Sequence, residues 1–118
     1  MNTFYYLSTC DTCHRIMQAL NLPNSVQLRE IKGQPLSKTE LMQLYKLSGS
    51  YEALFSKRAR LYKERNLKEA DLQENDFKSL LLEHYTFLKR PVLVFDGEIF
   101  IGNSKKTVEA ASKAVNKD

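Results

Sequence analysis

The sequence has few cysteines and histidines, and it lacks long apolar runs. Its 118 residues include two cysteines, two histidines and no tryptophan. No apolar run approaches the roughly 20 residues that span a bilayer, so we expect no membrane segment. Met1 leads directly into an aromatic run without a basic start, which is unlike a secretory signal. We therefore expect a cytoplasmic protein.

The scarcity of metal ligands limits what the two cysteines can do. They stand in the stretch CDTCH at positions 10–14, and C-x-x-C is shared by c-type haem attachment, zinc sites and redox dithiols. Haem attachment normally takes place in an exported compartment. A closed zinc site needs four Cys or His ligands, and the only candidates are Cys10, Cys13, His14 and His84. We therefore expect no metal and favour a redox dithiol, by elimination.

The net charge of +4 is mild, and its uneven part is a basic run at residues 57–65. Such a run is typical of a solvated helix face. It would also suit a surface that meets an acidic protein, or part of an anion site. No recognised nucleic-acid-binding motif is present, so we expect no direct contact with nucleic acid.

The N-terminal third has the pattern of a βαβ unit. Residues 3–7 form an aromatic-rich apolar run that predicts a buried strand. A helix follows, with Ile16, Met17, Ala19 and Leu20 on its apolar side. Residues 26–31 alternate apolar and polar, which predicts a second strand. Short links on either side of the helix make the two strands parallel.

The rest of the chain predicts a helical insert and a C-terminal β-hairpin followed by a helix. Ser37 and Glu40 form a capping box in front of a helix. The insert, at about residues 36–87, contains no convincing strand. Asp-Gly at 96–97 lies between two β-rich runs and is a strong hairpin signal. A residue at 103 or 104 caps the last helix.

This order of elements gives the two cysteines different chemistry. A strand that ends at Cys10 and a helix that begins there place its sulfur at a helix N-terminus. Unsatisfied N–H groups and the positive end of the helix dipole favour a thiolate at that point. Cys13 lies one turn further along and is more shielded. Cys10 is therefore the expected nucleophile and Cys13 the resolving thiol.

These motifs together resemble the ArsC-type arsenate reductase family, which includes the Spx transcriptional regulators. The likeness covers nearly the whole chain and is carried by C-x-x-C at 10–13 and Arg-Pro-Val at 90–92. It implies an α/β thioredoxin-like fold with a mixed four-stranded sheet. The helical insert would lie between the N-terminal βαβ unit and the C-terminal hairpin and helix, within one domain over residues 1–118.

The resemblance also assigns substrate-binding residues. It implies a cis Pro91 that faces the cysteine loop and an oxyanion ligand at Arg90. Two further arginines of the glutaredoxin-coupled reductases align with Ser56 and Gly102, so those anion ligands are missing here. The motif around Arg58 resembles the S-x-R of Spx proteins instead, and it makes Arg58 a third candidate ligand.

The function implied is that of an arsenate reductase-like thiol–disulfide oxidoreductase. Its electrons would come from a thiol donor such as glutathione, glutaredoxin or thioredoxin. We expect no bound cofactor beyond glutathione as a candidate co-substrate, and glutathione or a small oxyanion as the ligand. Three alternatives stay open: a Spx-like redox-sensing regulator that binds RNA polymerase, a glutaredoxin-coupled arsenate reductase, and a protein of this fold whose thiols are inert.

Overall fold

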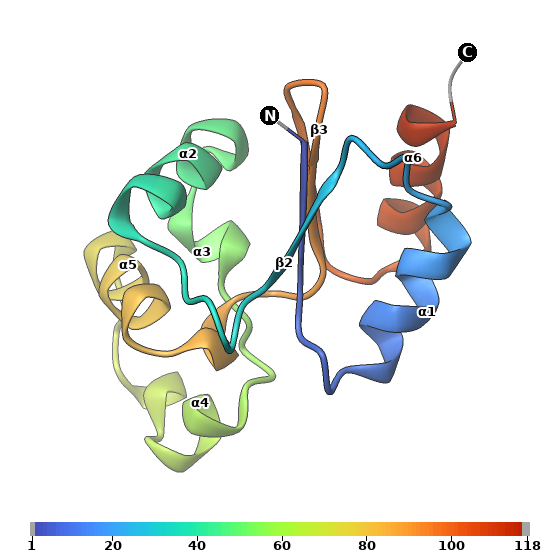
Figure 1. Cartoon of the computed structure of the whole chain (residues 1–118). Coiled ribbons are helices and arrows are strands. Elements are labelled where there is room, and N and C mark those ends of the chain that lie inside the picture. Colours follow the sequence, from blue (N-terminus) through green and yellow to red (C-terminus); the bar gives the residue numbers. More distant parts are fainter. Residues whose placement is uncertain (1, 117–118) are drawn as a thin grey trace. The chain divides into compact units, whose positions relative to one another are not determined.

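The computed structural model describes residues 2–116, which fall into two compact units (Figure 1). One unit combines the N-terminal segment up to Gln34 with the C-terminal segment from Arg90. The other is Pro35–Lys89, which contains the insert expected at about 36–87. The single-domain organisation stays a prediction, and each unit is described separately.

The first unit begins with the parallel βαβ arrangement that the sequence predicts. Strand β1 covers Thr3–Tyr6, helix α1 covers Asp11–Leu20 and strand β2 covers Gln27–Glu30. β1 and β2 pair in parallel, and Phe4 lies opposite Leu28. Asn21 ends α1 with a left-handed φ of 50°, a conformation that asparagine tolerates better than most residues.

The C-terminal hairpin completes the sheet. Strands β3 (Val92–Phe95) and β4 (Glu98–Ile101) are antiparallel, and β3 also pairs with β1 to give the order β2-β1-β3-β4. Asp96 and Gly97 have φ values of 50° and 81°. A two-residue hairpin turn of type I′ has positive φ at both central positions, which explains the Asp-Gly pair. The mixed four-stranded sheet is confirmed.

Helices α1 and α6 (Lys105–Val115) lie on the same face of this sheet (Figure 1). Side chains from both helices and from three strands or their flanks form the core there, and its buried members are Phe4, Ile16, Leu20, Val26, Leu93, Phe95 and Ala111. The prediction that Ala19 faces the core is wrong, because Ala19 is exposed on the outer side of α1. Within the described residues, no helix is both long and apolar enough to cross a membrane.

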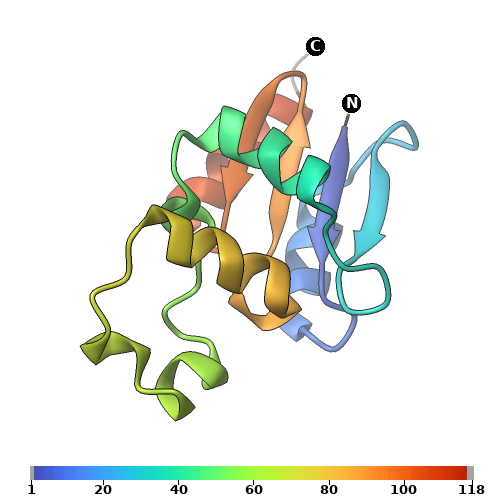
Figure 2. The same cartoon turned by 90° about the vertical axis from the view of Figure 1, so that its left-hand side faces the viewer.

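The second unit consists of short helices, whose course Figure 2 shows in green to gold. The elements are α2 (Lys38–Ser48), α3 (Tyr51–Leu54), α4 (Arg60–Glu64), η1 (Leu67–Glu69), α5 (Glu74–Glu83) and η2 (Tyr85–Phe87). The capping box of α2 is confirmed: Ser37 Oγ accepts from Glu40 N at 3.1 Å, and Glu40 Oε1 accepts from Ser37 N at 3.0 Å.

Aromatic side chains hold these short helices together. The Phe55 ring stacks on Phe87 with a centroid distance of 5.2 Å and meets Phe77 edge-on at 4.9 Å. All three side chains are buried. An isolated antiparallel bridge joins Phe55 to Leu88. Helices of four or five residues are not stable alone in water, so this packing stabilises the unit.

Candidate active site

Cys10 is the N-cap of α1. Its backbone is extended, with φ −96° and ψ 106°, and its Sγ accepts a hydrogen bond from the Cys13 backbone N–H at 3.3 Å. The Cys10 carbonyl accepts from His14 N at 3.2 Å, which closes the first turn. The sulfur therefore lies at the positive end of a ten-residue helix, where a thiolate is favoured. Cys10 is half-buried, so reagents can reach it.

Cys13 lies on the inner side of the same turn and has no exposed surface. Burial raises the pKa of the Cys13 thiol to about 12, helped by the neighbouring Cys10 sulfur and opposed by a backbone hydrogen bond at Leu7. Both cysteines are reduced in the structure. The Cys13 S–H is therefore held as a donor beside Cys10, which is the arrangement of a protonated resolving thiol beside a thiolate.

Arg90 provides the positive charge of the site. Burial alone would raise the pKa of Cys10, but it is outweighed. Hydrogen bonds from the Cys13 thiol and N–H, together with the charge and a hydrogen bond of the Arg90 guanidinium, bring the pKa below its ordinary value. The peptide bond between Arg90 and Pro91 is cis, as the resemblance implies, and Pro91 is buried directly before β3.

Sequence reasoning missed the residues that hold the loop between β1 and α1. Glu30, at the end of β2, accepts from Ser8 N at 2.9 Å and from Gly33 N at 2.6 Å. His14 Nε2 lies 2.7 Å from the Ser8 carbonyl oxygen. The hydrogen bond between Glu30 and Ser8 joins residues 22 apart in the chain, so no local sequence pattern predicts it.

The fifth predicted site residue, Arg58, belongs to the second unit. It is exposed and lies in the turn before α4. Its part in an anion site stays a prediction.

The basic run around Arg58 is largely paired with carboxylates of its own unit. Lys57 Nζ lies 2.8 Å from Glu52 Oε2 and Arg60 Nε lies 2.9 Å from Glu64 Oε2. Arg65 pairs with Glu83, and its charge also lies 5.7 Å from the centre of the Phe87 ring. These contacts favour a solvated, self-neutralised surface over a patch for an acidic partner.

In the part of the chain that the structure describes, no three His, Cys, Asp or Glu side chains gather in a way that could hold a metal ion. The groups that meet at Cys10 are two thiols, a guanidinium and a helix terminus.

The chain shares its α/β, thioredoxin-like fold with an ArsC family related protein from Bacteroides fragilis, at a TM-score of 0.78 and 23% identity, over 93% of this chain and 97% of that one. It is also similar to an arsenate reductase from Vibrio cholerae, at a TM-score of 0.75 and 22% identity, over 96% of each chain.

Sequence comparison establishes the family. The ArsC family model matches residues 5–111. The uncharacterized protein YusI of Bacillus subtilis (strain 168) is 36% identical over 101 residues, which cover 81% of this chain and 84% of the relative. The chain belongs to the ArsC family, and the predicted thioredoxin-like fold and family are confirmed.

Proposed function

We propose that this protein is a thiol–disulfide oxidoreductase of the arsenate reductase-like type, with Cys10 as the nucleophile and Cys13 as the resolving thiol. The observation that carries the proposal is the position of Cys10 Sγ, 3.3 Å from the Cys13 N–H at the start of α1. Arg90 and the helix terminus favour a thiolate at Cys10, while burial keeps Cys13 protonated.

The reaction proceeds in two exchanges. The Cys10 thiolate attacks one sulfur of a disulfide substrate, forms a mixed disulfide and releases the other sulfur as a thiolate. Cys13 then gives its proton to a leaving thiolate and attacks Cys10 Sγ, which releases the second substrate thiol. The substrate gains two electrons, and the protein is left with a disulfide between Cys10 and Cys13.

The first exchange also prepares the second. The charge and hydrogen bonding of the Cys10 sulfur are among the causes that raise the pKa of Cys13. Once Cys10 is in a mixed disulfide, its negative charge is gone and the pKa of Cys13 falls. Burial still raises the pKa of Cys13 at that stage, so the first exchange eases the ionisation of the resolving thiol without removing the largest cause of its high pKa. Two molecules of a thiol donor, such as glutathione, or one dithiol protein would restore the reduced state.

Thiol counting after mild oxidation tests the proposal. We expect oxidised glutathione to remove both thiols of the wild-type protein without forming dimers, and Cys13→Ser to stop at a mixed disulfide between Cys10 and glutathione. A wild-type protein that keeps both thiols, or that forms only intermolecular bridges, would contradict the proposal. A disulfide that forms but is never turned over by glutathione, glutaredoxin or thioredoxin would favour the Spx-like regulator that binds RNA polymerase.

Arsenate is a poor candidate substrate for this site. The resemblance places one of the missing anion-holding arginines at Gly102, which has a φ of +91° and donates its N–H to the Pro91 carbonyl at 2.8 Å. That backbone conformation suits glycine and disfavours a side chain. Turnover of arsenate at about 1 per second or faster with glutathione and glutaredoxin would overturn this part of the proposal.

A further inference from the structure

The Ser8 peptide, two residues before Cys10, is held from both sides. Its N–H donates to Glu30 Oε2 at 2.9 Å, and its carbonyl oxygen lies 2.7 Å from His14 Nε2. A carbonyl oxygen can only accept, so His14 Nε2 must carry the proton. Ser8 is exposed, so these two hydrogen bonds, rather than packing, fix its place.

Both partners of Ser8 are themselves fixed to the sheet. Glu30 is the last residue of β2, and its second oxygen accepts from Gly33 N at 2.6 Å. Hydrogen bonds from Gly33 and Ser8 lower the pKa of Glu30, so the group is an ionised acceptor at neutral pH. The His14 ring meets the Tyr6 ring of β1 edge-on, with centroids 6.0 Å apart.

We propose that Glu30 and His14 are positioning residues for Cys10, which act through the Ser8 peptide. Cys10 N–H bonds to the Leu7 carbonyl at 3.0 Å, so Ser8 lies inside the tight turn that delivers Cys10 to the helix terminus. A turn held at Ser8 keeps Cys10 Sγ within reach of the Cys13 N–H and of Arg90.

The sign of the effect distinguishes positioning from simple charge. This inference rests on the proposed function, because it takes the thiolate of Cys10 as the reactive group. A carboxylate that acted only as a nearby negative charge would raise the pKa of Cys10, and its removal would lower that pKa. A carboxylate that positions the loop has the opposite effect: its removal lets Cys10 leave the favourable place, and the pKa rises.

The experiment measures iodoacetamide labelling of Cys10 against pH in Glu30→Ala, Glu30→Gln and His14→Ala. We expect Glu30→Ala to raise the pKa and to move the labelling profile to higher pH; at pH values below the pKa, labelling should slow about three- to tenfold, since one pKa unit is there a tenfold change in thiolate. Rates above pH 10 should match the wild type. Glu30→Gln keeps an acceptor for Ser8 N–H and should recover most of the loss. Combining Glu30→Ala with His14→Ala should slow labelling of Cys10 by less than the product of the two single effects, because both residues hold the same peptide.

Two controls keep the result interpretable. Glu109→Ala, on the exposed side of α6, makes the same change in net charge and should leave the titration unchanged. Labelling of buried Cys13 reports unfolding, and if Glu30→Ala unfolds, Glu30→Gln and His14→Ala carry the test. A lowered or unchanged pKa in the folded variants would overturn the inference. An ordinary titration of Cys10 in the wild type would instead overturn the proposed function.

Discussion

The N-termini of α1 and α3 have the same cap with a different atom. Cys10 Sγ accepts from the N–H three residues ahead at 3.3 Å, and Ser50 Oγ accepts from Ala53 N at 3.2 Å. Both capping residues have extended backbones. The two sites belong to different units, so the likeness is one of local geometry.

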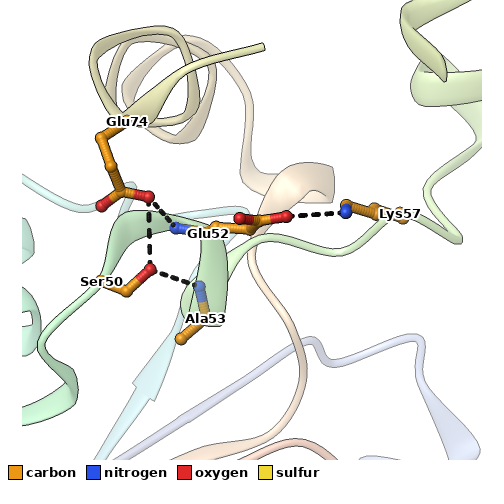
Figure 3. A network of polar contacts seen from close by, with 5 residues as sticks. All are labelled: Ser50, Glu52, Ala53, Lys57 and Glu74. Carbon is orange, nitrogen blue, oxygen red and sulfur yellow. Dashed lines mark hydrogen bonds and ion pairs between the residues drawn. The ribbon is translucent and has the colours of Figure 1, made fainter. Parts of the chain in front are cut away.

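What differs is the charge that each cap meets. Ser50 Oγ donates to Glu74 Oε2 at 3.2 Å, and the same oxygen accepts from Glu52 N at 3.0 Å (Figure 3). The other carboxylate oxygen accepts from Tyr51 N at 2.7 Å. A carboxylate therefore binds the start of α3 and accepts a hydrogen bond from the capping hydroxyl. Cys10 faces the guanidinium of Arg90 instead, which favours loss of its proton.

The comparison shows that a helix cap becomes a reactive centre through its surroundings. The cap itself satisfies one orphan N–H group in both places and contributes stability. Sulfur ionises more readily than a hydroxyl, and a cationic neighbour lowers the pKa of Cys10 further. An anionic neighbour would cancel that advantage. Three predictions test this account, from the largest effect to the smallest.

Cys10→Ser turns the reactive cap into the structural one. Burial, the largest cause of the raised pKa of Cys13, is kept when Cys10 is replaced, although the loss of the Cys10 charge removes part of the rise, so Cys13 should still carry little thiolate at pH 7. We expect iodoacetamide labelling and disulfide exchange at pH 7 to fall at least about 1000-fold relative to the wild type. The serine oxygen still caps α1, so the free energy of unfolding should change by less than about 1 kcal/mol.

Cys13→Ser is the matched control, because it removes the other thiol and should keep rapid labelling at Cys10. A Cys10→Ser protein that retains a tenth of the wild-type rate would show that Cys13 is the nucleophile.

Ser50→Cys makes the reverse exchange, in a protein whose own cysteines are both replaced by serine. The new thiol would cap α3 beside the Glu74 carboxylate, which should raise its pKa. We expect labelling at pH 7 to be at least about tenfold slower than that of Cys10 in the Cys13→Ser protein.

Slow labelling at position 50 could come from the Glu74 carboxylate or from the shorter helix, since α3 has four residues and α1 has ten. Adding Glu74→Gln to this variant separates the two causes. Labelling should become faster when the carboxylate is neutralised. Equal rates for the thiols at positions 50 and 10 would mean that a helix terminus suffices and that Arg90 adds nothing.

The sequence predicted what depends on neighbours along the chain. The Asp-Gly turn, the capping box at Ser37 and the switch from strand to helix at Cys10 are local features, and each is present. The apolar period predicted the core face of α1 as well, apart from Ala19, because small apolar residues are tolerated on an exposed helix face.

The sequence did not predict the two carboxylates that hold the helix starts. Glu30 reaches Ser8 across 22 residues, and Glu74 reaches Tyr51 across 23. A glutamate at a strand end or in a first helical turn is ordinary on a solvated surface, and its partners are backbone groups that every residue has. Only the fold brings donor and acceptor together, so such contacts leave no local pattern.

Glu74→Gln has the smallest expected effect and isolates the contribution of the structural cap. One amide oxygen cannot serve three donors as two carboxylate oxygens do, and bonds to charged acceptors are stronger, so we expect a loss of about 1 kcal/mol at pH 7. Burial would raise the pKa of Glu74, but hydrogen bonds from Tyr51, Glu52 and Ser50 lower it overall. The stabilisation is therefore present above the unfolded pKa of about 4.3 and is lost as pH falls through the lower, folded pKa.

Urea denaturation of Glu74→Gln and of the wild type at pH 7 and pH 3 measures this loss, and the difference between the two proteins should be smaller at pH 3. Glu69→Gln, an exposed glutamate of the same unit, should show little effect at either pH. If Glu74→Gln lost the same stability at pH 7 and pH 3, the loss would come from changed packing of the side chain and not from the carboxylate charge that distinguishes the α3 cap from the α1 cap.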